Sequence, residues 1–329
     1  MNRDWSGPVL ITGATGFLGR HLVAALVGRG LRVRALVRRP GAGLPGIEQE
    51  TVAALDDPAG LRRALEGVAT VMHLAAYVHQ PGKAHADEAA HRAINLDGTV
   101  ALLEAAVATG VRDFLFVSTV KAVGETSDTP WTEATPPRPV DPYGRSKLAA
   151  EQAVRAAADR HGLHAPILRL PLAYGPWMKA NALTLFDLVE RGTPLPLGRV
   201  DNRRSLVYVG NFVAAVQAVV EREAGNDLFF VSDGPPVSTP ELIRAIARAL
   251  DRPARLVPVP VGLMRAAGRA GDLLARVAPW RLTSVNLERM IGSLAVDSSK
   301  LAAVAGPPPF TLAAGLAATA RWYRARSGT

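Results

Sequence analysis

Residues 11–20 read ITGATGFLGR, and this stretch decides the fold class. Its glycines stand at 13, 16 and 19, between an apolar run at 8–12 and a helix-like segment at 21–30. In that context the first glycine permits a tight turn, the second lets backbone approach a pyrophosphate, and the third lets the helix pack closely on the strand. The helix N-terminal amides then face the phosphates. We therefore expect a dinucleotide-binding turn rather than a merely structural one.

Strand-like and helix-like segments alternate through the first half of the chain. Helices are expected at 61–67, 92–109 and 143–161, and the strands around them at 31–37, 51–55, 69–76, 112–119 and 164–171. Such alternation predicts a parallel sheet with right-handed crossovers. The expected fold class is α/β, with a Rossmann-type, doubly wound parallel sheet.

The pattern changes after Pro171, where prolines and glycines cluster. Strands at 206–210 and 227–232, with a helix at 211–223 between them, are expected to return to the sheet. We therefore expect a dinucleotide-binding domain from residues 1–171 plus about 206–232. A smaller, discontinuous C-terminal substrate domain would take about 172–205 plus 233–329, with helices at 239–250, 261–278 and 310–326. The basic, amphipathic helix at 261–278 is expected to pack against this domain, with membrane-surface contact as the alternative.

Composition narrows the classes of function. The 329 residues carry a net charge of +9, yet only five of the 38 basic residues are lysine and the arginines are scattered. A basic charge without a reading motif does not predict nucleic-acid binding, whereas a small anionic ligand needs only a few arginines. The absence of cysteine excludes disulfides and a cysteine nucleophile. The seven histidines show no HxxxH or HExxH spacing, so no metal site is expected.

The sequence also bears on location. The N-terminal residues lack the charged, apolar and small-residue regions of a signal peptide. No apolar run reaches the roughly 18 residues that a membrane span needs. We therefore expect a cytoplasmic protein without a membrane span.

Residues 141–147, DPYGRSK, place Tyr143 and Lys147 one turn apart on one helical face. A tyrosine has a pKa of about 10, and a neighbouring ammonium would lower this pKa. Ser118 and Thr119 stand at the carboxyl end of a predicted strand, where open α/β sheets bind ligands. The pattern predicts a tyrosine acid or base, a lysine that tunes it and reaches the cofactor ribose, and a hydroxyl that holds the substrate oxygen. A surface helix that carries both residues by chance is the alternative.

The end of the second strand bears on the choice of cofactor. An acid there binds the ribose 2′-hydroxyl of NAD, whereas an arginine accommodates the 2′-phosphate of NADP. The strand ends Val37-Arg38-Arg39, and no acid follows until Glu48. The sequence therefore favours NADP slightly, with NAD as the alternative and a solvent-facing Arg38 as the structural interpretation.

The chain resembles the extended short-chain dehydrogenase/reductases, close to the UDP-galactose 4-epimerases and the nucleotide-sugar 4-ketoreductases. The motifs that carry this resemblance, in matching order, are TGATGFLG (12–19), HLAA (73–76), NLDGT (95–99), VSTVKAVGE (117–125), YGRSK (143–147), LRLPLAYGP (168–176) and RRSLVYVGN (203–211). The fourth and the last look most like a branch that acts on UDP-linked amino or deoxy sugars in bacterial surface-polysaccharide pathways. Homologous folds often pair through a helix bundle, which suggests a homodimer.

The resemblance implies roles for individual residues. It assigns the catalytic roles to Thr119, Tyr143 and Lys147. The residues predicted to bind the dinucleotide are Gly13, Thr15, Gly16, Phe17, Leu18, Gly19, Arg38, Leu55, Leu74, Ala75, Ala76, Asn95, Ser118, Tyr143, Lys147 and Pro171. Those predicted to bind the nucleoside-diphosphate sugar are His79, Thr119, Lys121, Asn181 and Arg204.

Departures from the family pattern favour one reaction over another. Leu172 stands where the epimerases carry a substrate-contacting asparagine, and Ala54 replaces an aspartate that commonly binds adenine. With the missing acid after the second strand, each of these weakens an epimerase assignment. Arg38 and Leu172 favour 4-ketoreduction of a UDP-4-keto sugar, in which Tyr143 donates the proton. A UDP-sugar 4-epimerase with tightly bound NAD is the alternative. A non-catalytic dinucleotide-binding regulatory module is a remote one, against which the intact catalytic residues argue.

Overall fold

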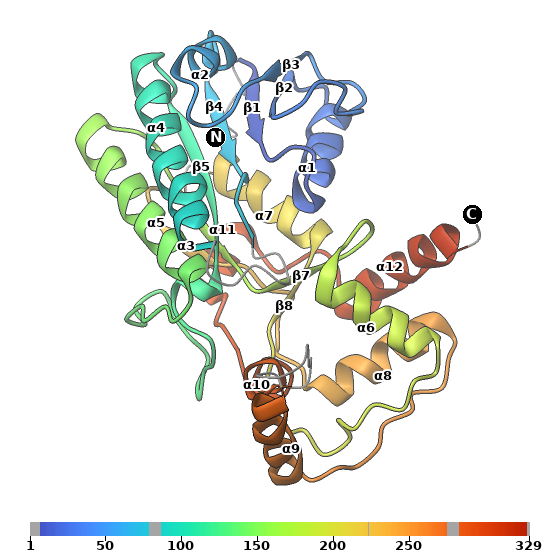
Figure 1. Ribbon diagram of the computed structural model, residues 1–329. Coiled ribbons are helices and arrows are strands. Elements are labelled where there is room, and N and C mark those ends of the chain that lie inside the picture. The colour runs from blue at the N-terminus through green and yellow to red at the C-terminus, as the bar shows by residue number, and fades with distance from the viewer. Residues whose placement is uncertain (1–6, 79–86, 223, 275–282, 328–329) are drawn as a thin grey trace.

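A parallel sheet organises the N-terminal two thirds of the molecule (Figure 1). The computed structural model describes residues 7–78, 87–222, 224–274 and 283–327. Within them, seven strands form the sheet in the order β3-β2-β1-β4-β5-β6-β9, and every neighbouring pair is parallel. The strands are β1 (Val9–Thr12), β2 (Val33–Val37), β3 (Gln49–Val52), β4 (Thr70–His73), β5 (Asp113–Thr119), β6 (Ile167–Leu170) and β9 (Leu228–Phe230). This confirms the predicted Rossmann-type fold class.

Helices cover both faces of this sheet, because its central strands are apolar on both sides. One face packs against α1 (Phe17–Gly28), α7 (Val209–Glu221) and α11 (Ser299–Ala305). The other packs against α2 (Pro58–Leu65), α4 (Gly98–Ala108) and α5 (Pro142–His161). Figure 1 shows α4 and α5 on one side of the sheet and α1 and α7 on the other. The carboxyl ends of the strands therefore open between two helical layers.

A second hydrophobic core lies beyond that edge. It is built by α6 (Ala180–Glu190), α8 (Thr239–Leu250), α9 (Val261–Leu274), α10 (Ser284–Ile291) and α12 (Leu312–Ser327). Helix α9 packs on α10, with Gly268 close to Ser284 and Leu287. This packing agrees with the favoured interpretation of the basic helix at 261–278, whose residues beyond 274 lie outside the described part of the chain.

One predicted strand joins a different sheet. Residues 206–210 were expected to return to the main sheet, but β8 (Leu206–Tyr208) pairs in parallel with β7 (Leu172–Tyr174) in a separate two-stranded sheet. Only β9 returns, beside β6. The main sheet's edge beside β6 is already taken by β9, and the short β7 leaves β6 directly through Pro171. The prediction for 206–210 was therefore wrong in its partner, although a strand is present.

Three element boundaries also differ from the expected ones. Helix α1 begins at Phe17, directly after the glycine turn, rather than near residue 21. The third strand ends at Val52 rather than residue 55. The helix expected at 92–109 opens with a π-helical segment at Arg92–Asp97, preceded by α3 (Asp87–His91). This wide turn contains Asn95, whose side chain contacts both the loop after β4 and helix α5.

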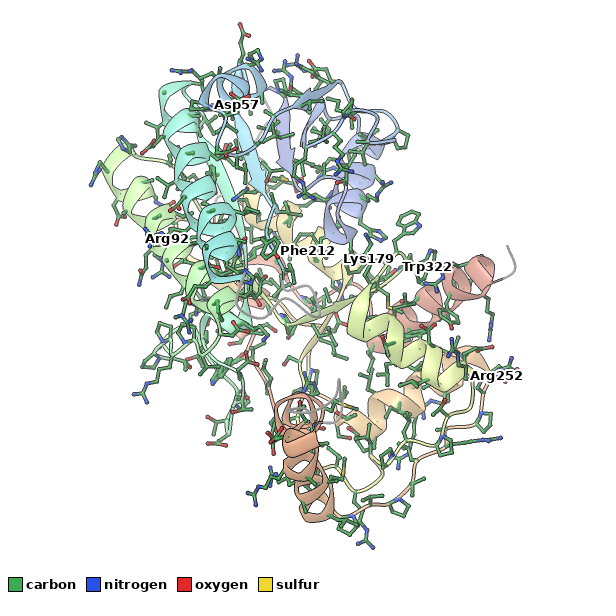
Figure 2. All side chains as sticks on the ribbon, in the orientation of Figure 1. Asp57, Arg92, Lys179, Phe212, Arg252 and Trp322 are labelled. Atoms are coloured by element: carbon green, nitrogen blue, oxygen red, sulfur yellow. The ribbon has the colours of Figure 1, made fainter. Side chains whose placement is uncertain are left out.

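The charged residues are spread over the surface. Figure 2 shows Arg92 and Arg252 at opposite sides of the molecule, whereas Phe212 lies in its interior. Arg252 pairs with Glu190, so part of this charge is neutralised locally.

Candidate active site

The glycine turn is held by close backbone packing. Gly13 has φ +70°, and a Cβ placed on it would lie 2.7 Å from the backbone nitrogen of Ala75. A Cβ on Gly19 would lie 2.2 Å from the carbonyl oxygen of Gly13. Real Cβ atoms do not approach backbone this closely, so both positions require glycine. A Cβ on Gly16 would meet only the Gly13 oxygen, at 3.1 Å. The first and third glycines are thus explained by packing, and the second leaves the start of α1 open to a ligand.

The loop after β4 forms the neighbouring wall. The Ala75 nitrogen donates to Thr12 Oγ1 at 3.1 Å, which fixes the loop to the end of β1. Asn95 Oδ1 accepts from the Tyr77 nitrogen at 2.6 Å, and Asn95 Nδ2 donates to the Tyr77 oxygen at 3.1 Å and to Ser146 Oγ at 3.0 Å. Asn95 therefore joins this loop to the helix that carries Tyr143. Asn95 is itself buried, and its predicted contact with the dinucleotide stays a prediction.

His73 is a core residue beneath this wall. Its Nδ1 lies 2.6 Å from Thr12 Oγ1 and its Nε2 lies 2.9 Å from Thr99 Oγ1, which donates to the Asn95 oxygen. Burial, followed by the charge of Lys147, lowers the pKa of His73 to about 3. His73 is therefore a neutral link between β1 and the π-helical turn. The two threonines were missed by sequence analysis because their partner lies far away in the chain.

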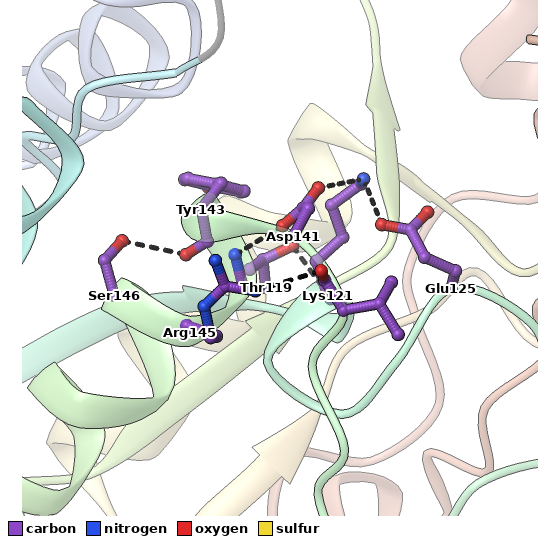
Figure 3. Close-up of polar contacts among 9 residues, drawn as sticks. Thr119, Lys121, Glu125, Asp141, Tyr143, Arg145 and Ser146 are labelled. Carbon is purple, nitrogen blue, oxygen red and sulfur yellow. Dashed lines mark hydrogen bonds and ion pairs between the residues drawn. The ribbon is translucent and has the colours of Figure 1, made fainter. Parts of the chain in front are cut away.

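Tyr143 and Thr119 meet at the carboxyl edge of the sheet. Thr119 ends β5, and Tyr143 stands in the first turn of α5, which Asp141 caps by accepting from the Gly144 nitrogen at 2.6 Å. The side chain of Thr119 lies close enough to the Tyr143 phenol to oppose the rise in its pKa. The predicted catalytic tyrosine and hydroxyl are thus brought together, with Asp141 beside them (Figure 3).

The expected lowering of the Tyr143 pKa is contradicted. Burial, followed by the carboxylate of Asp141, raises the pKa of Tyr143 to about 12, and the nearby Thr119 side chain opposes this rise. The spacing of Tyr143 and Lys147 predicted a phenol tuned by an ammonium. Instead, Lys147 Nζ donates to the Val117 carbonyl at 2.8 Å and lies 3.9 Å from the Phe116 ring centroid. Tyr143 is therefore a protonated acid in this arrangement.

The burial of Lys147 changes the ionisation of its amino group. The residue is 2% exposed. Burial lowers the pKa of its ammonium to about 7, and the charge of Glu151 opposes the shift. Lys147 therefore titrates near neutral pH, although an exposed lysine would remain charged.

The side chain of Ser118 is hydrogen-bonded to helix α5. Its Oγ donates to Glu151 Oε1 at 2.5 Å, and Arg169 holds the same carboxylate through two hydrogen bonds of 3.0 and 2.6 Å. The Ser118 side chain therefore faces α5 rather than serving as a free hydroxyl. Glu151 and Arg169 were not singled out in the sequence, although Glu151 follows Lys147 by one helical turn.

Lys121 forms ion pairs next to Tyr143. Its Nζ lies 2.6 Å from Glu125 Oε1 and 2.8 Å from Asp141 Oδ2, as Figure 3 shows. Its backbone nitrogen donates to Thr119 Oγ1 at 3.3 Å. The ammonium was predicted to bind the sugar, but here it neutralises two carboxylates at the site.

Of the other predicted substrate residues, only Arg204 has a side chain that the structure describes. Arg204 is largely buried, its Nη1 donates to the Gly292 carbonyl at 3.1 Å, and burial lowers its pKa while Glu125 opposes this. Asn181 lies in the first turn of α6, and its side chain is outside the described residues. His79 lies wholly outside them.

The remaining predicted cofactor residues lie along the same edge or near it. Thr15 and Leu18 belong to the glycine turn and the start of α1. Arg38 is exposed directly after β2. Leu55 is partly buried and packs against Gly98, and Pro171 is buried between β6 and β7. Leu74 and Ala76 flank Ala75 in the loop after β4.

None of the helices that the structure describes has both the length and the hydropathy to cross a bilayer. Among the described residues, no group of three or more histidines or carboxylates could hold a metal ion.

The sheet order, the glycine turn and the motif order define an extended short-chain dehydrogenase/reductase fold. The chain belongs to the NAD dependent epimerase/dehydratase family, whose sequence profile matches residues 9–230. This confirms the resemblance seen in the motifs. The protein is thus an enzyme of NAD-dependent epimerase/dehydratase type.

Individual relatives cover nearly the whole chain. The UDP-glucose 4-epimerase of Vibrio cholerae is 34% identical over 98% of this chain and 97% of its own length. The ceramide reductase of Caulobacter vibrioides is 33% identical over 99% of this chain and 97% of its own. Among solved structures, MoeE5 in complex with UDP-glucuronic acid and NAD is 29% identical, with a TM-score of 0.77 over 97% of this chain and 100% of that one.

Proposed function

We propose that this protein carries out NAD(P)-dependent oxidoreduction at C4 of a nucleoside-diphosphate hexose, with a UDP-sugar as the favoured substrate. The observation that carries the proposal is the proximity of Tyr143, in the first turn of α5, to Thr119, at the carboxyl end of β5. Open α/β sheets bind their ligands at this edge. The names of the relatives support the substrate class, because MoeE5 was solved with a UDP-sugar and NAD.

The residues present fit a dinucleotide. The backbone contacts of Gly13 and Gly19 hold the turn, and the open position at Gly16 leaves the N-terminus of α1 accessible to phosphate. Residues 15–18, the loop at 74–76 and the ribose-side Lys147 would hold the cofactor. When bound, the dinucleotide supplies or accepts the hydride.

The side chains provide the proton chemistry. Tyr143 donates its phenolic proton to the C4 oxygen during reduction, and Thr119 stabilises the charge that develops on that oxygen. Oxidation requires the reverse transfer, for which the phenolate needs a cation nearby. Lys147 provides one when its ammonium leaves the Val117 carbonyl and turns toward the phenol. Arg204, with its planar guanidinium, would bind the diphosphate.

Two outcomes of this chemistry are proposed, each on its own observation. The protonated Tyr143 and Leu172 in place of asparagine favour 4-ketoreduction. The similarity to the Vibrio cholerae 4-epimerase over nearly the full length favours 4-epimerisation. Purified protein offered UDP- and dTDP-sugars separates them: reduction consumes added NADPH or NADH, whereas epimerisation interconverts the sugars without net consumption.

The cofactor preference rests on Arg38. Its exposed position directly after β2 suits a 2′-phosphate, which supports NADP, whereas the relatives solved with NAD support that cofactor. Arg38→Ala should weaken NADPH binding by about tenfold, the loss of one charge-assisted contact, and leave NADH binding unchanged. Calorimetric titration of both cofactors measures this. Equal losses for both would remove Arg38 from the 2′-phosphate site.

Tyr143→Phe tests the proposed reaction itself. Removal of the proton donor should lower kcat by at least about 100-fold, the size of a general-acid contribution, while dinucleotide affinity stays within about twofold. Turnover and calorimetric cofactor binding are measured together. Full turnover in this variant would exclude the proposed role, and a regulatory module would be little altered by the change.

A further inference from the structure

A buried charged cluster lies beneath the candidate catalytic residues. It comprises Ser118 on β5, Glu151 on α5 and Arg169 on β6, and is called the Glu151 cluster below. The side chains of Arg169 and Glu151 are 5% and 3% exposed. Both oxygens of the carboxylate are used, one by Arg169 Nη2 and the other by Arg169 Nε and Ser118 Oγ. Such a fully bonded group ties three elements together.

The position of this cluster follows from the strand pattern. Side chains alternate between the faces of a strand, so Phe116 and Ser118 share the face that α5 covers. Glu151 follows Lys147 by four residues on α5 and therefore lies on the same side of the helix. Lys147 packs over Phe116, immediately beside the cluster. The carboxylate thus lies between an arginine that it holds directly and a lysine one turn away.

The charges explain why such a lysine can stay in the interior. A buried ammonium is strongly disfavoured unless a counter-charge or hydrogen bonds compensate it. The titratable groups near Lys147 are Tyr143 and Glu151, one turn before and one turn after it on its own helix, and His73 on β4, while Arg169 on β6 holds the Glu151 carboxylate. His73 is neutral, and Arg169 shares the Glu151 carboxylate. Glu151 is therefore the negative charge among these groups.

We propose that Glu151 is a positioning residue: its carboxylate seats α5 against β5 and β6 and favours the charged form of Lys147 beneath the catalytic edge. The link to turnover rests on the proposed function, whereas the effect on Lys147 does not. Ser118 and Arg169 orient the carboxylate, and Lys147 experiences its charge. The cluster thereby couples the geometry of the sheet to the ionisation of a residue one turn from Tyr143.

Nuclear magnetic resonance on the lysine side chains tests this directly. The chain contains only five lysines, so protein labelled with ¹⁵N and ¹³C in lysine gives few side-chain signals. Lys147→Met identifies the Lys147 signal by its disappearance. Glu151→Gln should lower the titration midpoint of Lys147 by about one pH unit or more, and Arg169→Met should raise it. The exposed Asp159→Asn, on the same helix, is the matched control and should leave the midpoint unchanged.

Opposite shifts in the two variants distinguish an electrostatic role from structural damage. Equal midpoints in Glu151→Gln and Asp159→Asn, or shifts of the same sign in Glu151→Gln and Arg169→Met, would overturn the inference. If Glu151→Gln does not fold because it leaves Arg169 unpaired, the double variant Glu151→Gln/Arg169→Met is compared with Arg169→Met. The midpoint should then still fall when the carboxylate is removed, and an unchanged midpoint would overturn the inference.

Turnover separates this inference from the proposed function. If Lys147 acts as an ammonium, the falling alkaline limb of kcat should move to lower pH in Glu151→Gln by the same amount as the lysine midpoint. A shifted midpoint with an unmoved kcat profile would reject the catalytic role of Lys147 and leave the positioning of its charge by Glu151 supported.

Discussion

Lys147 carries its amino group inside the protein, and this has opposite consequences for turnover and for stability. The pKa falls from 10.5 to about 7 on folding, chiefly through burial. The folded protein therefore binds fewer protons at this residue than the unfolded chain between these two pKa values, so this residue's contribution to stability rises with pH there. Below about pH 7 the charged form is buried at full cost.

Lys147→Met should therefore abolish turnover yet stabilise the protein. Because the ammonium is mostly charged at pH 6 and largely neutral at pH 9 in the folded state, the gain in unfolding free energy should be about 3 kcal/mol larger at pH 6. Urea unfolding at both pH values measures it. The exposed Lys179→Met is the control and should show no such difference. A variant less stable than the wild type at pH 6 would contradict the assigned burial penalty.

Lys121 should act on kcat rather than on substrate affinity. Its ammonium neutralises Glu125 and Asp141, and Asp141 already raises the pKa of Tyr143. Lys121→Met should raise that pKa further and lower kcat by about tenfold for each unit, with little change in KM. Steady-state kinetics measure the split. A rise in KM at unchanged kcat would instead restore the predicted contact with the sugar.

Sequence analysis located these residues better than it described their chemistry. The Asp-Pro start of a helix placed Tyr143 and Lys147 correctly in the first two turns of α5, because capping and spacing are local. Spacing does not specify which way a long side chain turns. Lys147 could reach the phenol or the Val117 carbonyl, and burial against Phe116 favours the second. The Tyr143 pKa was predicted wrongly for that reason.

At the scale of elements, the glycines of the turn are needed for two different reasons: Gly19 for backbone packing and Gly16 for access of the dinucleotide. Gly19→Ala places a Cβ on backbone and should destabilise the fold by about 2 kcal/mol or more, read as a lower melting temperature. Gly16→Ala meets a single atom at 3.1 Å and should leave the melting temperature nearly unchanged while weakening dinucleotide affinity at least about tenfold. Equal effects of the two variants on stability and binding would contradict this division.

Strand partners were harder to predict than strands. The apolar run at 206–208 was recognised, but three residues contain no information on which edge they pair with. Pairing with β7 is decided by the way the chain leaves β6 through Pro171 and by β9 occupying the sheet edge. The glycine turn, by contrast, is flanked in the sequence by the strand and the helix that identify it. The dinucleotide-binding half was therefore predictable from a few residues.

At the scale of the molecule, the last part of the chain contributes to two separate cores. Leu301 on α11 packs in the core on one face of the main sheet, and Leu316 and Tyr323 on α12 pack in the second core. The chain therefore passes several times between the two proposed domains. These are residues 1–171 plus about 206–232, and the remainder of the chain. We expect β8, which pairs with β7, to belong to the junction between them.

Removal of residues 298–329 should consequently damage both parts. The loss of buried side chains from each core should cost several kcal/mol, because a single large-to-small change in a core costs about 2–5 kcal/mol. Circular dichroism and calorimetry should show no cooperative transition in the shortened chain. A dinucleotide-binding half that melts cooperatively without these residues would contradict the shared dependence.

The interleaved path of the chain also sets an order of events during synthesis. The main sheet is not complete until β9 is made, and its helical cover is not complete until α11 has left the ribosome. Strand edges and apolar faces made early must wait, exposed, for partners made late, which is the condition under which nascent chains aggregate. A shortage of chaperones in the producing cell should accordingly reduce the yield of this enzyme before it reduces the activity of each folded copy.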